Sequence, residues 1–124
     1  MHRFILTTGF ILATAAAALA ADLDVQIIER GGDGQMANCA SSVVGGLKAG
    51  GDGFLAVRSG PGTEFRKLDE LHNGDVVIEF ERRGPWVGVV HGTRNIRCDS
   101  TVDRPVTAPR KGWVHGKWLQ PLAG

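Results

Sequence analysis

Three histidines could supply a catalytic base in this chain of 124 residues: His72, His91 and His115. Serines stand at positions 41, 42, 59 and 100, and a serine activated by a histidine is the nucleophile of many hydrolases. None of these serines lies in a Gly-x-Ser-x-Gly context, and no motif joins a serine to a histidine. We therefore interpret the histidines as partly exposed residues and expect no catalytic residue, with a small hydrolase as an alternative.

Two pairs of carboxylates could imitate the acid pair of a glycosidase: Asp69 with Glu70, and Glu79 with Glu81. The second pair occupies alternate positions of the run "VVIEFE", whose other alternate positions are apolar. Alternate residues of a strand point to the same face. The pattern therefore predicts a solvated face for Glu79 and Glu81 rather than a catalytic pair.

The stretch "VRSGPG" could be a phosphate-binding loop or a bend between two strands. A phosphate loop leads into a helix, and in nucleotide hydrolases it ends in Gly-Lys-Ser/Thr, neither of which "SGPGTEFRKLDEL" provides. Pro61 fixes its own φ, and Gly62 tolerates a positive φ, so the two suit the centre of a type II turn. We predict that Gly60, Pro61 and Gly62 form a structural turn.

The first twenty residues have the features of a secretory signal peptide. A short basic start precedes the apolar run "FILTTGFILATAAAALA", which closes on the small residues Ala18 and Ala20. We predict cleavage before Ala21, which makes residues 1–20 a signal peptide and the mature protein periplasmic or secreted. An uncleaved membrane anchor is the alternative, but the run is shorter than the ~20 residues that a spanning helix needs. No stable membrane insertion is expected after cleavage.

Cys39 and Cys98 are the two cysteines of the chain. Zinc sites usually take their ligands in close pairs, and neither cysteine has another Cys or a His within two to five residues. We therefore expect no metal. In the oxidising compartment that export implies, a lone pair of cysteines usually forms a disulfide. Closing a loop of about sixty residues would stabilise the fold by roughly 4 kcal/mol in the chain-entropy model.

Charge gives no general attraction to nucleic acid or anionic lipid. The chain has 14 Lys and Arg residues against 13 Asp and Glu residues, and one of the basic residues, Arg3, lies in the predicted signal peptide. One stretch is locally basic, through Arg94, Arg97, Arg104, Arg110 and Lys111. Because two aspartates interrupt it, we interpret this stretch as a solvated loop.

The mature chain divides into an arm and one domain. Residues 21–37 contain a single apolar run, "VQII", followed by "GGDGQ", so we expect a flexible N-terminal arm with little to bury. The two "GGDG" stretches, at 31–34 and 50–53, are interpreted as turns rather than calcium repeats. From residue 54, the runs "FLAVR", "VVIEFE", "WVGVV" and "GWVHGKWL" alternate and are separated by turns, with a tight helical turn expected at "GKWL". The domain, residues 38–124, is predicted to be all-β.

The segments "FLAVRSGPGTEFRKLDELHNGD", "VVIEFERRGPWVGVV" and "KGWVHGKWL" together resemble the bacterial Src-homology-3-like domains, which are small β-barrels of exported and cell-envelope proteins. The pattern of that family is Leu-x-Val-Arg-x-Gly-Pro-Gly, an aromatic residue, Leu-x-x-Gly, a Trp and a late Gly-Trp-Val. In this sequence it falls on Leu55, Val57, Arg58, Gly60, Pro61, Gly62, Phe65, Leu71, Gly74, Trp86, Gly112, Trp113 and Val114. The resemblance covers residues 54–122 and implies a Src-homology-3-like β-barrel.

The chain departs from the family pattern in two places. Residues 91–111 form a long insertion that carries Cys98, where the family usually has a short hairpin. Upstream, "NCASSVVGGL" carries Cys39 and indicates an extra strand. A disulfide would therefore pin the upstream segment to the insertion, beside the barrel.

The resemblance implies binding rather than catalysis, and it implies no cofactor. Members of the family hold cell-wall peptides or other envelope partners, so we expect an exported binding module for a peptidoglycan peptide or glycan, or for a periplasmic protein. Arg58, Phe65 and Trp86 are the candidate ligand-binding residues, because exposed aromatics beside an arginine can form a shallow groove. In the alternative, Phe65 and Trp86 belong to the core. A structural or inhibitory interaction protein that uses its insertion is the rival function.

Overall fold

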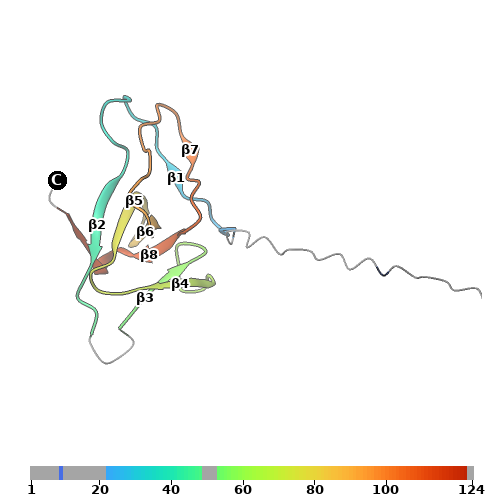
Figure 1. The fold of residues 1–124 in the computed structure, drawn as a ribbon, viewed down its shortest axis with the longest axis vertical. Helices are drawn as coiled ribbons and strands as arrows, with labels where there is room; N and C mark the ends of the chain where they lie inside the picture. Colours follow the sequence, from blue (N-terminus) through green and yellow to red (C-terminus); the bar gives the residue numbers. More distant parts are fainter. Residues whose placement is uncertain (1–8, 10–21, 49–52, 123–124) are drawn as a thin grey trace, which may run out of the picture.

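The computed structural model describes Gly9 and residues 22–48 and 53–122 (Figure 1). All of the predicted signal peptide except Gly9, the cleavage site before Ala21 and most of the second "GGDG" turn lie outside these residues. Within the described part of the chain, no helix is long and apolar enough to span a membrane.

The described residues form an all-β structure, as the sequence predicts. In chain order the strands are β1 (Ile28–Glu29), β2 (Ala40–Val44), β3 (Leu55–Arg58), β4 (Lys67–Leu71), β5 (Val76–Arg83), β6 (Trp86–His91), β7 (Arg104–Pro105), β8 (Lys111–His115) and β9 (Leu119–Pro121). The helical turn predicted at "GKWL" is present as the short 3-10 helix η1 (Gly116–Trp118). His115 caps it, because its Nδ1 accepts a hydrogen bond from the Lys117 N–H at 3.2 Å.

Seven strands form one antiparallel sheet in the order β4-β3-β8-β6-β5-β2-β9, and β1 pairs with β7 in a separate two-stranded sheet. The larger sheet is not a closed barrel, because its edge strands β4 and β9 each pair with only one neighbour. The expectation of a closed barrel is therefore wrong. The upstream strand β2 lies between β5 and β9 and pairs with both. It therefore widens the sheet, and the edge strands β4 and β9 do not pair with each other.

The sheet curls around a hydrophobic cluster, here called the inner core, to which all seven strands contribute. Its members are Val44, Leu47, Leu55, Val57, Leu71, Val77, Val87, Val89, Val114 and Leu119. Leu71 of one edge strand and Leu119 of the other belong to this same cluster, although their strands do not pair. Val87 and Val89 are fully buried at alternate positions of β6, which confirms the alternation predicted for "WVGVV".

The opposite face of the sheet carries a second cluster, here called the outer core. Its buried members are Leu23, Ile27, Ile78, Phe80, Val90, Cys98, Val106 and Trp113. The indole N–H of Trp113 donates to the Val25 carbonyl oxygen at 2.9 Å, which ties the N-terminal segment to β8. Gly88 lies opposite Trp113 on β6, and a Cβ there would lie 2.8 Å from Ile27 Cγ2. The absence of a side chain at Gly88 therefore lets the N-terminal segment lie against the sheet.

Residues 21–37 were expected to be an arm with little to bury, and this is wrong for residues 22–29. Leu23 and Ile27 are buried, and β1 pairs with β7. In Figure 1, β1 and β7 lie together beside the large sheet. The partner strand lies in the insertion, 75 residues further along the chain from Glu29 to Arg104, where no local pattern reveals it.

The predicted disulfide between Cys39 and Cys98 is present. It joins the start of β2 to the insertion, so that residues 22–39 and 92–110 form one layer over the outer core, here called the cover. Cys98 and Val106 of the insertion are buried in the outer core, whereas Val102 and the four arginines stay exposed, in agreement with a solvated basic stretch.

The "SGPG" stretch is a bend, but not the predicted type II turn. Gly62 does not have a positive φ. The hydrogen-bonded turn instead lies two residues later, where the Phe65 N–H donates to the Gly62 carbonyl at 3.3 Å. Gly60 is the position that needs a glycine for space, because a Cβ there would lie 2.5 Å from the Phe65 ring.

The prediction that Glu79 and Glu81 share a solvated face is also wrong. A β-bulge between them shifts the register of β5, so that Glu79 lies opposite Val89 whereas Glu81 lies opposite Gly88. Glu81 therefore turns to the side of the outer core. Its side chain is 5% exposed and pairs with Arg83, whose Nε lies 2.9 Å from Glu81 Oε1.

Candidate ligand-binding pocket

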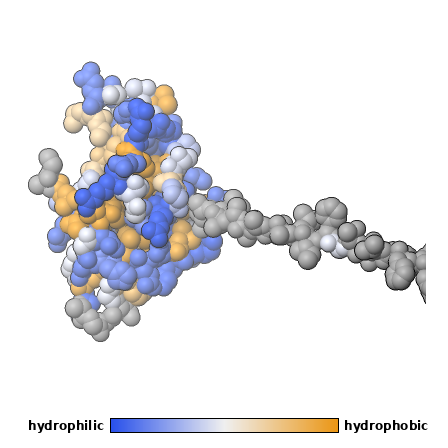
Figure 2. Space-filling model, viewed as in Figure 1, coloured by the Kyte–Doolittle hydropathy of each residue, from blue (hydrophilic) through white to orange (hydrophobic). Residues whose placement is uncertain are grey.

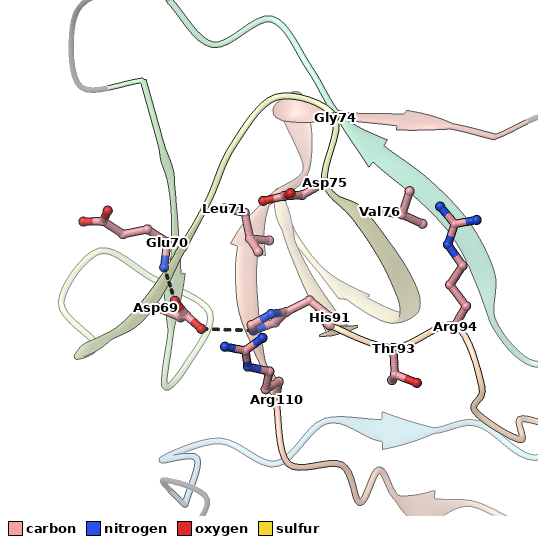
Figure 3. Close-up of a pocket in the computed structure, with 11 residues that line it drawn as sticks. Asp69, Glu70, Leu71, Gly74, Asp75, Val76, His91, Thr93, Arg94 and Arg110 are labelled. Carbon is pink, nitrogen blue, oxygen red and sulfur yellow. Dashed lines mark hydrogen bonds and ion pairs between the residues drawn. The ribbon is translucent and has the colours of Figure 1, made fainter.

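A polar cavity of about 570 Å³ opens at one end of the sheet (Figure 3). One wall comes from β4 and from the turn that joins it to β5, and the other from the end of β6 and from the two ends of the insertion. The cavity therefore forms where the "HNGD" turn meets the insertion, two parts of the chain that the curl of the sheet brings together.

Carboxylates occupy the first wall. Asp69 and Glu70 come from β4, and the Glu70 N–H donates to Asp69 Oδ1 at 2.8 Å. Asp75 is held by the tight turn before β5, where its Oδ2 accepts the His72 N–H at 2.7 Å and Gly74 takes a φ of 92°. Glu70 is already paired with a lysine on its own strand. Asp69 and Asp75 are thus the acidic groups positioned to contact a ligand.

His91 lies between the two walls at the end of β6. Its side chain is 5% exposed, so the interpretation of the three histidines as partly exposed is wrong for this one. Its Nε2 lies 3.9 Å from Asp69 Oδ2. Burial lowers the pKa of His91 below its ordinary value, and Arg110 acts in the same direction, while Asp69 and Asp75 oppose them. His91 is therefore a neutral imidazole near pH 7.

Two arginines occupy the second wall, Arg94 and Arg110. Among the described residues, neither guanidinium forms a salt bridge. In Figure 3, Arg110 lies beside His91 and Asp69, and Arg94 lies on the side of Val76. Gly92 makes room for Arg110, because a Cβ there would lie 2.9 Å from Arg110 Cδ. The pocket thus offers two cations that the described residues leave without a counter-ion.

The arrangement suits recognition of charge better than bond cleavage. Arginines can bind a carboxylate by paired hydrogen bonds, and Asp69 and Asp75 can bind an ammonium group across the cavity. Thr93 is the hydroxyl in the pocket, and its Oγ1 accepts the Asn95 N–H at 3.1 Å instead of bonding to His91. The described residues contain no cluster of three or more His, Cys, Asp or Glu side chains that could hold a metal ion.

The three predicted ligand-binding residues lie elsewhere, on the side of the sheet that carries the outer core. Arg58 Nη1 donates to the Phe65 carbonyl at 3.0 Å, and Phe65 packs over Gly60. Trp86 packs edge-to-face against His115, with ring centroids 5.5 Å apart. None of the three lines the pocket in Figure 3. Each is half-buried, and their role in binding stays a prediction.

The surface beside the "SGPG" bend is occupied by the N-terminal segment of the chain itself. The Ser59 hydroxyl donates to Asp24 Oδ2 at 2.6 Å, and the Val25 N–H donates to the Ser59 carbonyl at 3.1 Å. Arg66 adds an ion pair to Asp24, with Nε 3.3 Å from Oδ2. The bend where a ligand groove was predicted is therefore a docking site for residues 22–25.

The sequence analysis singled out the basic insertion but did not connect it with the "HNGD" turn, which forms the other wall of the pocket. The length of the insertion, together with its place between two strands of the same sheet, could have indicated the position of the pocket. Both ends of the insertion have to lie at that sheet. Comparison with family models, curated proteins and solved structures found no match to this chain.

Proposed function

We propose that the chain is an exported, non-catalytic binding module that recognises a cell-envelope peptide carrying both a carboxylate and an amine. The observation that carries the proposal is that Arg94 and Arg110, which form no salt bridge among the described residues, line the same cavity of about 570 Å³ as Asp69 and Asp75. Wall peptides possess both charged groups. A zwitterionic ligand would pair its carboxylate with the arginines of one wall and its ammonium group with the aspartates of the other.

The proposal includes membership of the bacterial Src-homology-3-like class. Its support is the position of the motif residues: Leu55 and Val57 lie in the inner core, and the Gly-Trp-Val run lies on β8 directly before η1. Figure 2 shows one face of the molecule, on which hydrophilic residues are mixed with apolar areas. The disulfide supports an oxidising, extracytoplasmic location.

Titration calorimetry with a wall peptide that carries a free amine and a free carboxylate tests the proposal. The matched probes are the same peptide with its amine acetylated or its carboxylates amidated. The Arg110→Gln change removes the charge-assisted contact between the guanidinium and the peptide carboxylate, which is worth about 1.5–3 kcal/mol. Affinity for the free peptide should therefore fall roughly tenfold or more.

Arg97→Gln is the control, because Arg97 is an exposed arginine of the same insertion outside the pocket. It should bind the free peptide like the wild type. Equal affinity of the wild type for the free and amidated peptides, or equal loss in both variants, would contradict the proposed site.

A further inference from the structure

The imidazole of His91 forms no hydrogen bond with the described residues, although its side chain is only 5% exposed. Among those residues, Glu81 Oε2 is the one fully buried side-chain polar atom without a partner. The unbonded ring nitrogens of His91 are therefore accessible from the cavity that this residue lines, and in Figure 3 the ring points towards Asp69. Buried polar groups usually have a hydrogen-bond partner, so an unbonded imidazole that faces a cavity indicates a place for a ligand atom.

The spacing between His91 and Asp69 indicates which kind of atom fits. His91 Nε2 lies 3.9 Å from Asp69 Oδ2, which is too far for a direct hydrogen bond. A single donor atom about 2.8 Å from both would make an angle of about 90° with them, close to the angle between two N–H bonds of an ammonium group. One primary ammonium group could thus donate to the carboxylate and to the imidazole at the same time.

The charged groups that face His91 come from three parts of the chain. Asp69 belongs to β4, and Asp75 belongs to the turn before β5. Arg110 lies at the end of the insertion, where its carbonyl oxygen accepts the His91 backbone N–H at 3.1 Å. The other charged side chains that line the pocket are Glu70 and Arg94. The two aspartates therefore make the neighbourhood of the imidazole suitable for a cation.

The protonation state of His91 fits the role of an acceptor. Burial lowers its pKa, and Arg110 acts in the same direction against Asp69 and Asp75, so the ring is neutral near pH 7. A neutral imidazole has one nitrogen that can accept a hydrogen bond, whereas the protonated ring has none. A ligand ammonium group therefore meets an acceptor at His91 and not a like charge.

We propose that His91 and Asp69 together receive a primary ammonium group of the ligand, with His91 Nε2 as the neutral acceptor that selects a primary amine. Leu71 lines the same part of the cavity and offers apolar surface to a methylene stem that carries the amine. A peptide side chain such as that of lysine has this form. The inference rests on the proposed function and deepens it, because it names the group bound at the acidic wall and adds a specificity-determining residue there.

Titration calorimetry of the disulfide-bonded protein with acetyl-Ala-Lys, which carries one amine and one carboxylate, tests the proposal. In one matched probe a hydroxyl group replaces the side-chain amine. In the other, three methyl groups on the amine keep its charge and remove its N–H donors. Each should bind at least about tenfold more weakly than acetyl-Ala-Lys. Equal or tighter binding of the hydroxyl probe, or equal binding of the trimethylated probe, would overturn the proposal.

Two variants of His91 test the residue itself. His91→Leu removes the acceptor, so affinity for acetyl-Ala-Lys should fall at least about tenfold, whereas His91→Gln keeps an acceptor on its side-chain amide and should lose less. His72→Gln, at an exposed histidine that does not line the pocket, should bind like the wild type. Unchanged affinity in His91→Leu, together with weaker binding by Arg110→Gln, would refute this inference alone. Absence of binding by the wild type would contradict the proposed function as well.

The wild-type protein gives a further test that needs no substitution. Protonation of His91 removes the acceptor and adds a cation, so affinity for acetyl-Ala-Lys should fall as the pH drops through the lowered pKa of His91. The ring resonances of His91, followed by NMR between neutral and acid pH, should titrate at a still lower pH in the presence of this peptide. An unchanged titration would overturn the proposal. A titration moved to higher pH would also overturn it, because the carboxylate of the peptide would then lie at His91.

Discussion

The two faces of the sheet are buried in different ways. The inner core is built almost wholly by the strands themselves, through alternate apolar residues such as Val87 and Val89. The outer core instead needs a cover made of two segments that are distant in sequence and are joined by the disulfide. The inner core therefore forms when the strands pair. The outer core is buried only when segments distant in sequence have also come into contact.

The cover is held together by polar contacts as well as by apolar ones. Glu29 of β1 is buried in the cover, and it accepts hydrogen bonds from Asn38 Nδ2, the Ser100 N–H and Arg104 Nε at 2.9, 2.9 and 3.0 Å. One carboxylate thus joins both segments of the cover. No residue of the inner core has a comparable role, because its members are all apolar.

The largest expected effect comes from removing the disulfide with Cys39→Ser and Cys98→Ser together. Loss of a disulfide typically lowers the free energy of unfolding by roughly 2–4 kcal/mol, with the chain-entropy figure of roughly 4 kcal/mol as the upper value. Because the bridge joins the two segments of the cover, amide exchange should accelerate more in residues 22–30 and 96–106 than in β6. Denaturation and hydrogen exchange measure both effects. Equal acceleration everywhere would show that the two faces open as one unit.

A smaller effect is expected from Gly88→Ala, which adds a Cβ where Ile27 lies. Overpacking of this kind typically costs about 1–3 kcal/mol. The change should release the N-terminal segment and leave the inner core intact. Ile27→Ala tests the cause, because the double variant should lose less stability than the sum of the two single changes. Simple additivity of the two losses would argue against the contact.

The smallest effect should come from acid, through Glu29. Burial raises the pKa of Glu29, but hydrogen bonds from Asn38, Ser100 and Arg104 outweigh it and hold the pKa below its ordinary value. The stability contributed by Glu29 is then present above the pKa of an unfolded glutamate, about 4.3, and is lost as the pH falls through the lower folded value.

Urea midpoints measured between neutral and acid pH check this sign. Glu29→Gln should be less stable than the wild type at neutral pH and should lose less stability on acidification. Glu64→Gln, an exposed change, should follow the wild type. A steeper acid loss in Glu29→Gln would contradict the assignment.

Local patterns in the sequence predicted the local features of the fold. The alternation in "WVGVV", the turn at "GKWL" and the lone cysteine pair all lie where expected. Gly62 shows the limit of this reasoning. Pro-Gly favours a positive φ at the glycine, but the requirement for glycine lies at Gly60, where the Phe65 ring packs, and residue propensity does not report such a contact.

Contacts between distant segments could not be predicted in the same way. The bulge that buries Glu81 interrupts the alternation of β5 without any glycine or proline to mark it. His91 is buried, and placed beside Asp69, by the curl of the sheet. Ile27 is buried against Gly88, a glycine on a strand that lies much later in the sequence. Each of these outcomes depends on which strands become neighbours, which a single sequence leaves open.

The pairing of β1 with β7 has a consequence for the order of folding. The hairpin of β5 and β6 needs only the short connection at Gly84 and Pro85, whereas β1 pairs with a strand that follows five further strands in the sequence. Contacts between residues so distant in sequence form slowly, because the chain loses the entropy of the intervening loop first. The indole of Trp113 should therefore remain accessible to solvent until a late docking step. In a variant with Trp86 and Trp118 replaced by phenylalanine, the fluorescence of Trp113 should report the arrival of the N-terminal segment separately from the formation of the sheet.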